Sequence, residues 1–397
     1  MRHKNFIVVQ SSMAEGDVCR IRLESIAPLG DAIGRIEGKT VFVEGGAPQE
    51  TVLCRITDEH RTWANAQLLE IIEPSQVRVD KTCVYYGKCG GCNLQHIDYN
   101  AQLAAKASIL TEHFMIIGGF SPPKPEIVPS PPWEYRNRMQ FHCLRQKAKS
   151  ESSCFGLKER RSGEIIAVQD CPISSAGIRK LLRGGGNIPM PPEKDRFTVF
   201  SNGELFLSEG GLERGKIKLL EKEIIVDAGV FFQSNIVMLE KLIAELRSYC
   251  KEEPDASMAD LYCGVGTFAL FLGTKYAKTI LTEENKKAVA VARENLKGRN
   301  AEFFALRDTE WEKAILRRKA DFNFAVVDPP RAGLALKLAQ SLAQNGPPVL
   351  AYVSCDSASL ARDSKILTGG GYKLDKLTLF DFYPQTSHIE TLAVFGR

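Results

Sequence analysis

The spacing of hydrophobic and polar residues differs between the two ends of the chain, and at the N-terminal end it alternates. Cys19, Ile21 and Leu23 face one side of a segment whose intervening residues, such as Arg20 and Arg22, are charged. Several short segments of this kind, separated by turn residues, follow one another over residues 13–73. The pattern predicts five strands that close into a small β-barrel of the OB type.

A middle region follows over residues 80–227 and changes its pattern twice. It begins with a cysteine-rich stretch, Cys83 to Cys92, and an apolar periodicity over residues 101–117 that predicts a helix. After a proline-rich linker at 122–132, the residues alternate again as in strands. We therefore expect a β-rich central domain.

From residue 228 to 397, helical and strand-like patterns take turns. Helices are predicted at 237–249, 286–296 and 335–344, and strands at 257–262, 279–282, 324–327 and 349–354. Such alternation predicts the α/β class, here a Rossmann-like, doubly wound and mostly parallel sheet. Ligands of such sheets bind at the carboxyl ends of the strands.

Composition and charge narrow the possible classes. The 397 residues suffice for two or three domains, and no apolar run approaches the roughly 18 residues of a membrane span. The first residues lack the pattern of a secretory signal, so we expect a cytoplasmic protein without membrane contact. Eleven cysteines in such a protein suggest metal-binding or catalytic thiols.

The net charge of +4 is too small to indicate a nucleic-acid partner, but the charge is unevenly distributed. Residues 133–161 carry eight lysines and arginines against three glutamates, with aromatic residues between them. Such a segment suits phosphates and stacked bases. A solvated strand face is the alternative interpretation.

A glycine-containing loop, Asp260 to Gly266, follows a predicted strand and opens a predicted helix. Such a loop brings the backbone close to a nucleotide-like ligand. A dinucleotide dehydrogenase would use Glu283, at the end of the next strand, to bind a ribose. S-adenosylmethionine is favoured because Asp260 precedes the loop and Asp328-Pro-Pro follows a later strand.

Cys355 is the candidate nucleophile. It lies in the sequence between Asp328-Pro-Pro-Arg331 and the segment Pro384 to Glu390, each of which supplies a carboxylate. If the substrate is a uracil, a thiolate that adds to carbon 6 makes carbon 5 nucleophilic enough to accept a methyl group. A base must then remove the proton from carbon 5, and Glu390 suits this role.

The segment Tyr352 to Asp363, taken with Asp328 to Arg331, Phe231 to Asn235 and Pro384 to Thr391, resembles the RNA 5-methyluridine methyltransferase family. It is especially similar to the iron–sulfur-containing enzymes that methylate 23S ribosomal RNA, and the N-terminal barrel resembles a TRAM domain. The resemblance implies structured, ribosomal RNA as the partner, with no obligate protein partner. It implies that Cys355 is the nucleophile and Glu390 the base. It also places four residues around S-adenosylmethionine: Gln233, Tyr262, Glu283 and Asp328.

Three points stay open at this stage. A transfer-RNA methyltransferase would use the same chemistry, and a non-catalytic RNA-binding or chaperone protein could keep the same architecture. Asp356 departs from the family, which usually has asparagine after the nucleophile. A negative charge there could raise the pKa of the Cys355 thiol, or the side chain could point away.

Four cysteines have spacing that suits a metal centre. Cys83, Cys89 and Cys92, with Cys171 further along the chain, could hold zinc or an iron–sulfur cluster. The family resemblance favours a [4Fe-4S] cluster.

Overall fold

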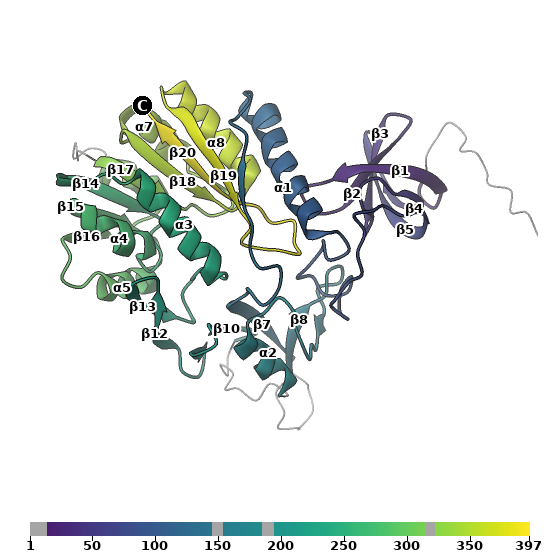
Figure 1. Cartoon of the computed structure of the whole chain (residues 1–397), viewed down its shortest axis with the longest axis horizontal. Coiled ribbons are helices and arrows are strands. Elements are labelled where there is room, and N and C mark those ends of the chain that lie inside the picture. The colour runs from purple at the N-terminus through teal and green to yellow at the C-terminus, as the bar shows by residue number, and fades with distance from the viewer. Residues whose placement is uncertain (1–13, 145–153, 185–193, 315–321) are drawn as a thin grey trace, which may run out of the picture. The chain divides into compact units, whose positions relative to one another are not determined.

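The computed structural model describes residues 14–144, 154–184, 194–314 and 322–397 (Figure 1). Two compact units are present. The first runs to Lys106 and includes Gln385–Ser387, and the second comprises Ala107–Pro384 and His388–Arg397. No helix in the described ranges is both long and apolar enough to span a membrane.

In the first unit, five strands form a closed barrel in the order β1-β2-β3-β5-β4. They are β1 (Val18–Ile26), β2 (Ala32–Ile36), β3 (Lys39–Glu44), β4 (Thr51–Glu59) and β5 (Trp63–Glu73). Cys19, Ile21 and Leu23 point into the barrel core, and the residues between them are exposed. The alternation in the sequence therefore predicted both the strands and their buried face.

The second unit contains an antiparallel sheet in the order β11-β10-β7-β8-β9 and a separate hairpin, β12–β13. The elements are β7 (Arg138–Leu144), β8 (Cys154–Lys158), β9 (Ile165–Ile166), α2 (Ala176–Arg183), β10 (Arg196–Ser201), β11 (Phe206–Ser208), β12 (Arg214–Leu219) and β13 (Lys222–Asp227). Phe141, Phe155 and Phe197 pack together with ring centroids 4.9–5.8 Å apart. Three basic residues of the segment 133–161, Arg145, Lys147 and Lys149, lie outside the described residues.

An eight-stranded sheet forms the rest of the second unit, in the order β16-β15-β14-β17-β18-β20-β19-β6. Its strands are β6 (Glu126–Val128), β14 (Glu253–Leu261), β15 (Tyr276–Thr282), β16 (Ala301–Phe304), β17 (Phe322–Val327), β18 (Val349–Ser354), β19 (Lys373–Phe380) and β20 (Glu390–Gly396). Strands β14 to β18 pair in parallel, whereas β20 runs antiparallel to both of its neighbours. The predicted mostly parallel, doubly wound sheet is confirmed.

Helices cover both faces of this sheet. They are α1 (Tyr99–His113), continued by a π-turn (Phe114–Gly118), α3 (Ile236–Tyr249), α4 (Thr267–Leu272), followed by a 3₁₀ turn (Gly273–Lys275), α5 (Lys286–Asn295), α6 (Asp308–Ala314), α7 (Leu336–Asn345) and α8 (Ser357–Gly369).

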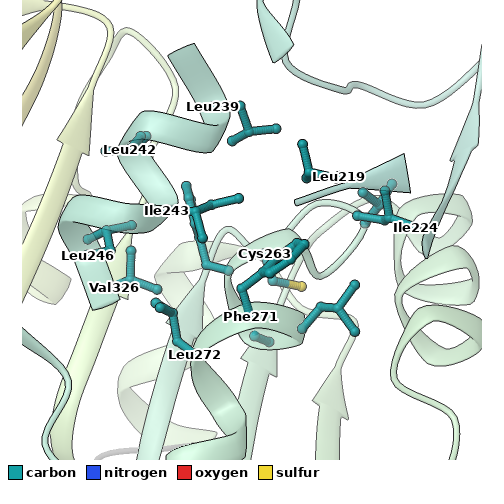
Figure 2. Close-up of a cluster of buried hydrophobic side chains, with 14 of the residues drawn as sticks. Leu219, Ile224, Leu239, Leu242, Ile243, Leu246, Cys263, Phe271, Leu272 and Val326 are labelled. Atoms are coloured by element: carbon teal, nitrogen blue, oxygen red, sulfur yellow. The ribbon is translucent and has the colours of Figure 1, made fainter. Parts of the chain in front are cut away.

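Two hydrophobic cores result, because successive residues of a strand point to opposite faces. On β17, Phe324 and Val326 join the core formed with α3, α4 and α5 (Figure 2). Ala325 and Val327 join the core formed with α7 and α8. The strands are thus buried on both faces, and polar residues lie at their ends.

Candidate active site

The carboxyl ends of the parallel strands carry the predicted site residues. Tyr262 follows β14, Glu283 follows β15, Asp328 follows β17 and Cys355 follows β18. Glu390 begins β20, which runs the opposite way, and the pairing of Ser354 with Thr391 brings that beginning beside the end of β18. Residues that are far apart in the sequence therefore meet at one edge of the sheet.

A cavity of about 1000 Å³ opens at this edge. All six predicted nucleophile, base and methyl-donor residues line it: Gln233, Tyr262, Glu283, Asp328, Cys355 and Glu390. The residues that sequence reasoning had not assigned to the site include Arg136, Arg138, Asp308, Trp311, Arg331 and Tyr383. His388, two residues before Glu390 in the sequence, also lines the cavity.

Burial raises the pKa of the Cys355 thiol to about 12, and the carboxyl groups of Glu390 and Asp328 contribute to the rise. Arg331 opposes it, because a positive charge favours the thiolate. At neutral pH the Cys355 thiol is therefore protonated unless a cation close by favours the thiolate, which is the nucleophilic form.

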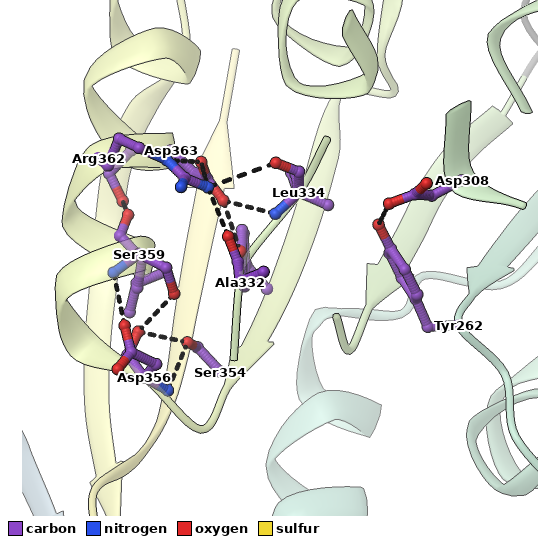
Figure 3. A network of polar contacts seen from close by, with 12 residues as sticks. Tyr262, Asp308, Ala332, Leu334, Ser354, Asp356, Ser359, Arg362 and Asp363 are labelled. Atoms are coloured by element: carbon purple, nitrogen blue, oxygen red, sulfur yellow. Dashed lines mark hydrogen bonds and ion pairs between the residues drawn. The ribbon is translucent and has the colours of Figure 1, made fainter. Parts of the chain in front are cut away.

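Asp356 follows this thiol in the sequence, but its side chain is engaged at the start of α8. Its carboxylate caps α8 by accepting a hydrogen bond from the Ser359 backbone N–H at 2.7 Å (Figure 3). Ser354 and Ser359 both donate to the Asp356 carbonyl oxygen, at 2.9 and 3.0 Å. The departure from asparagine is thus accommodated at a helix N-terminus, where a negative charge is favourable.

Two acidic residues of the cavity, Asp328 and Glu390, have raised pKa values. Burial raises the pKa of Asp328 to about 7, with Glu283 adding to the rise and a hydrogen bond from the Gln233 side chain opposing it. Burial also raises the pKa of Glu390 well above its usual range, and Asp328 adds to this. These carboxyl groups can remain protonated near neutral pH until a positive charge enters the cavity.

The loop after β14 is shaped by residues with left-handed backbone conformations, Tyr262 (φ 63°), Gly264 (φ 53°) and Gly266 (φ 79°). The Gly264 backbone N–H donates to Glu283 at 3.1 Å. Asp260, which was expected to reach a ligand, is fully buried and accepts from the Ala269 N–H of α4 at 2.8 Å. Asp260 therefore stabilises the loop from its buried side.

Two residues of the short helix α6 support Tyr262. The Tyr262 hydroxyl donates to Asp308 at 3.3 Å, and its ring packs edge-on against Trp311 at 4.3 Å between centroids. The aspartate that begins α6 was the available sequence signal, but the helix is too short to have a clear periodicity.

Two polar atoms at the cavity are buried without a hydrogen-bond partner, Oε1 of Gln233 and Nε of Arg138. The Arg138 guanidinium lies 5.7 Å from the centre of the Phe231 ring. Buried polar atoms are costly unless paired, so both atoms are suited to a bound molecule.

The four cysteines of the predicted metal centre are of intermediate exposure. Cys83, Cys89 and Cys92 lie in a loop of turns in the first unit, and Cys171 belongs to the second unit. Within the described ranges, no three His, Cys, Asp or Glu side chains are gathered as around a metal ion. Cysteine sulfur is the donor that iron–sulfur clusters require.

Known proteins resemble this chain over nearly its whole length. The pattern of tRNA (uracil-5-)-methyltransferases matches residues 216–396, and that of the TRAM domain matches residues 14–69. An uncharacterized RNA methyltransferase of Treponema denticola is 33% identical over 91% of this chain and 94% of its own. The 23S rRNA (uracil(1939)-C(5))-methyltransferase RlmD of Photorhabdus laumondii is 25% identical over 96% and 97%.

A solved structure shares the fold. It is the tRNA (uracil-54, C5)-methyltransferase of Pyrococcus abyssi in complex with S-adenosyl-L-homocysteine. The two are 23% identical, the TM-score is 0.72, and the match covers 95% of this chain and all of the other.

Proposed function

The chain belongs to the RNA (uracil-5-)-methyltransferase family with an N-terminal TRAM domain, and we propose that it methylates carbon 5 of a uridine in 23S ribosomal RNA, using S-adenosylmethionine. The observation that carries the proposal is the joint placement of Cys355, Glu390 and Asp328 in one cavity. Carbon-5 methylation of a uracil requires a thiol that adds to the ring and a base that removes the carbon-5 proton. The acidic side chains of the cavity can bind the positively charged methyl donor.

In the proposed reaction the Cys355 thiolate adds to carbon 6 of uracil, and the electron pair of the 5,6 double bond moves toward the carbonyl at carbon 4. S-adenosylmethionine, when bound, supplies an electrophilic methyl group. Carbon 5 forms a bond to this methyl group, the bond between methyl and sulfur breaks, and S-adenosylhomocysteine is the leaving group. Carbon 5 then carries both a methyl group and a proton. Glu390 removes the proton, its electron pair restores the double bond, and the thiolate leaves.

Four residues would hold S-adenosylmethionine: Gln233, Tyr262, Glu283 and Asp328. Glu283 is suited to the ribose hydroxyls, because it ends the second strand of the sheet. The acidic lining suits a positively charged molecule, since burial leaves Asp328 ready to ionise beside a cation. The free Oε1 of Gln233 adds an acceptor.

Ribosomal RNA is preferred over transfer RNA because the RlmD relatives are 25–29% identical to this chain, compared with 23% for the transfer-RNA enzyme of Pyrococcus abyssi. In this proposal the barrel (13–73) and the central region (80–227) hold RNA, and residues 228–397 carry out the chemistry. The target uridine must leave its stack to reach Cys355. The enzyme would act in the cytoplasm, where ribosomal RNA is modified.

The decisive assay measures tritium release from RNA that carries tritium at carbon 5 of uridine. We expect release by the wild type and none by Cys355→Ala. Cys250→Ala, which removes a buried thiol outside the cavity lining, should release tritium like the wild type. An inactive wild type, or full release by Cys355→Ala, would refute the proposal.

The choice of RNA is tested separately. Mapping 5-methyluridine in ribosomal and transfer RNA from a strain that lacks the gene should show the loss in 23S ribosomal RNA. A loss confined to transfer RNA would favour the other branch of the family.

We also propose that Cys83, Cys89, Cys92 and Cys171 bind a [4Fe-4S] cluster. The support is the spacing of the four cysteines and the resemblance to the cluster-containing enzymes. Gly87, in the same loop, has a φ of 84°, a conformation that lets the chain wrap tightly.

Protein purified without oxygen should be brown, absorb near about 400 nm and contain iron and sulfide. Cys171→Ser should lose the colour, and Cys143→Ser should keep it. A colourless protein that contains zinc would contradict the cluster.

A further inference from the structure

The carboxylate of Asp363, on α8, joins three segments of the active-site edge. Its side chain is fully buried. Oδ2 accepts hydrogen bonds from the Tyr352 hydroxyl and the Leu334 backbone N–H, each at 2.8 Å. Oδ1 accepts from Nε and Nη2 of Arg362, at 2.9 and 2.7 Å. A buried carboxylate that is so fully satisfied fixes its partners in place.

Arg362 extends the same attachment to the loop that follows Asp328-Pro-Pro. Its Nη2 donates to the carbonyl oxygens of Ala332 and Leu334, at 2.9 and 3.3 Å (Figure 3). Between them, Gly333 has a φ of 75°, and a Cβ atom there would lie 2.5 Å from Oδ2 of Asp363. The loop thus packs against the Arg362–Asp363 pair without space for a side chain.

Both joined segments, α8 and the loop, are connected in sequence to residues of the cavity. Helix α8 follows Cys355 directly, and the attached loop carries Arg331 immediately before Ala332. Arg331 and Cys355 line the same cavity, and the charge of Arg331 favours the thiolate against Glu390 and Asp328. The distance between thiol and cation is therefore set through α8 and the loop.

We propose that Asp363 and Arg362 are positioning residues that fasten the Arg331 loop to α8 and so keep the Arg331 guanidinium within electrostatic reach of the Cys355 thiol. The inference rests on the proposed function, in which Cys355 must be a thiolate. Loosening the attachment moves the cation away, and the thiol then ionises only at higher pH.

Other groups around Cys355 also enter its pH dependence. Glu390 comes from β20 and Asp328 from the end of β17, and Tyr383 and His388 line the same cavity from the β19–β20 connection. Nδ1 of His388 lies 3.4 Å from Nη2 of Arg331. Measurements in a His388→Gln background therefore separate the titration of this imidazole from that of the thiol.

The test measures the rate at which iodoacetamide alkylates Cys355 as a function of pH, with mass spectrometry of the Cys355 peptide and without RNA or methyl donor. Arg331→Gln should slow alkylation about three- to tenfold at neutral pH, which corresponds to about half to one pH unit. Asp363→Asn and Arg362→Ala should slow it by a similar factor. The double variant Arg331→Gln/Arg362→Ala should be no slower than Arg331→Gln alone.

Leu367→Ala is the matched control, because it removes a buried apolar side chain of α8 and leaves the hydrogen-bonding groups of Arg362 and Asp363 unchanged. It should lower thermal stability and leave the alkylation profile in place. An unchanged profile in folded Arg362→Ala and Asp363→Asn, an additive double variant, or the same shift in Leu367→Ala would overturn the proposal.

The two proposals can fail separately. If the wild type does not methylate RNA but Arg362→Ala still displaces the alkylation profile, the positioning role stands and the proposed function falls. If methylation is normal and the profile does not move, the positioning role falls.

Discussion

The cavity has an acidic wall, formed by Glu283, Asp328 and Glu390, and a basic wall, formed by Arg136 and Arg138. The two walls come from different parts of the fold. Glu283, Asp328 and Glu390 come from the ends of strands in the large sheet, and the pKa values of Asp328 and Glu390 are raised by burial. Arg136 and Arg138 come from the central region. Asp328 and Glu390 can stay neutral until a cation binds, whereas guanidinium groups stay charged at any physiological pH.

This difference suits two partners of opposite charge. A sulfonium compound gains from carboxyl groups that ionise on its arrival, and RNA gains from permanent positive charge. The thiol lies among both kinds of charge, since Glu390 and Asp328 disfavour its ionisation and Arg331 favours it. Substitutions on each wall should therefore have separable effects.

The largest effect is expected from Glu390→Gln, which removes the base but leaves the thiol. Turnover should fall at least about a hundredfold, because the carbon-5 proton then has no acceptor. Addition to carbon 6 does not need the base, so a covalent protein–RNA adduct should accumulate with ordinary uridine RNA. Denaturing gels would detect it, and the double variant Cys355→Ala/Glu390→Gln should show none.

On the basic wall, Arg138→Gln should raise the KM for RNA about tenfold and leave the affinity for S-adenosylmethionine unchanged. If the guanidinium contacts a phosphate, the slope of log affinity against log salt should fall by about one. RNA binding at several salt concentrations measures this. Arg214→Gln, at an exposed ion pair outside the cavity lining, should behave like the wild type. Weaker S-adenosylmethionine binding by Arg138→Gln would show that the walls are not separate.

The acidic wall should make the binding of S-adenosylmethionine depend on pH. Burial raises the pKa of Asp328 to about 7, and a bound cation lowers it, so binding releases protons. Affinity should therefore rise a few-fold as pH increases from about 6 to about 8 and then level off. Calorimetry in buffers of different ionisation enthalpy detects the released protons.

S-adenosylhomocysteine, which lacks the sulfonium charge, is the matched ligand and should release fewer protons. Proton uptake on binding, or equal release by both ligands, would contradict the acidic wall as the binding surface for the positive charge.

The smallest effect is expected from Asp356→Asn, because Asp356 lies outside both walls as the cap of α8. Asparagine caps helices about as well as aspartate, so stability should change by less than about 0.5 kcal/mol. Activity should change by less than about twofold. A large gain in activity would show that the Asp356 charge does reach the thiol.

The sequence predicted the barrel and most of the parallel sheet because their residues repeat with clear periods. Helix α3, for example, was expected at 237–249 and spans Ile236–Tyr249. The residues at the strand ends could also be selected, since Asp328 and Cys355 follow buried strands directly. What the pattern could not give was β20 as an antiparallel strand, which brings Glu390 to Cys355 through long-range pairing.

The basic wall and the neighbours of Tyr262 were harder to predict for two reasons. Arg136 and Arg138 belonged to a basic segment that a solvated strand would also explain. Trp311 and Asp308 lie on a helix of seven residues, too short for its apolar face to be recognised. The positioning role proposed for Arg362 and Asp363 depends on side-chain contacts, which the spacing of residues in the sequence does not predict.

Strand β6 is only three residues long, yet it pairs with β19 at the end of the large sheet, far from the other strands in sequence. A fragment cut to contain only the C-terminal catalytic residues would leave the β19 backbone groups unpaired on that side. Exposed edges of this kind recruit other strands. The catalytic region therefore cannot be transferred by itself into another protein. A fusion or minimal enzyme built from it needs residues 126–128 or an edge redesigned to resist aggregation.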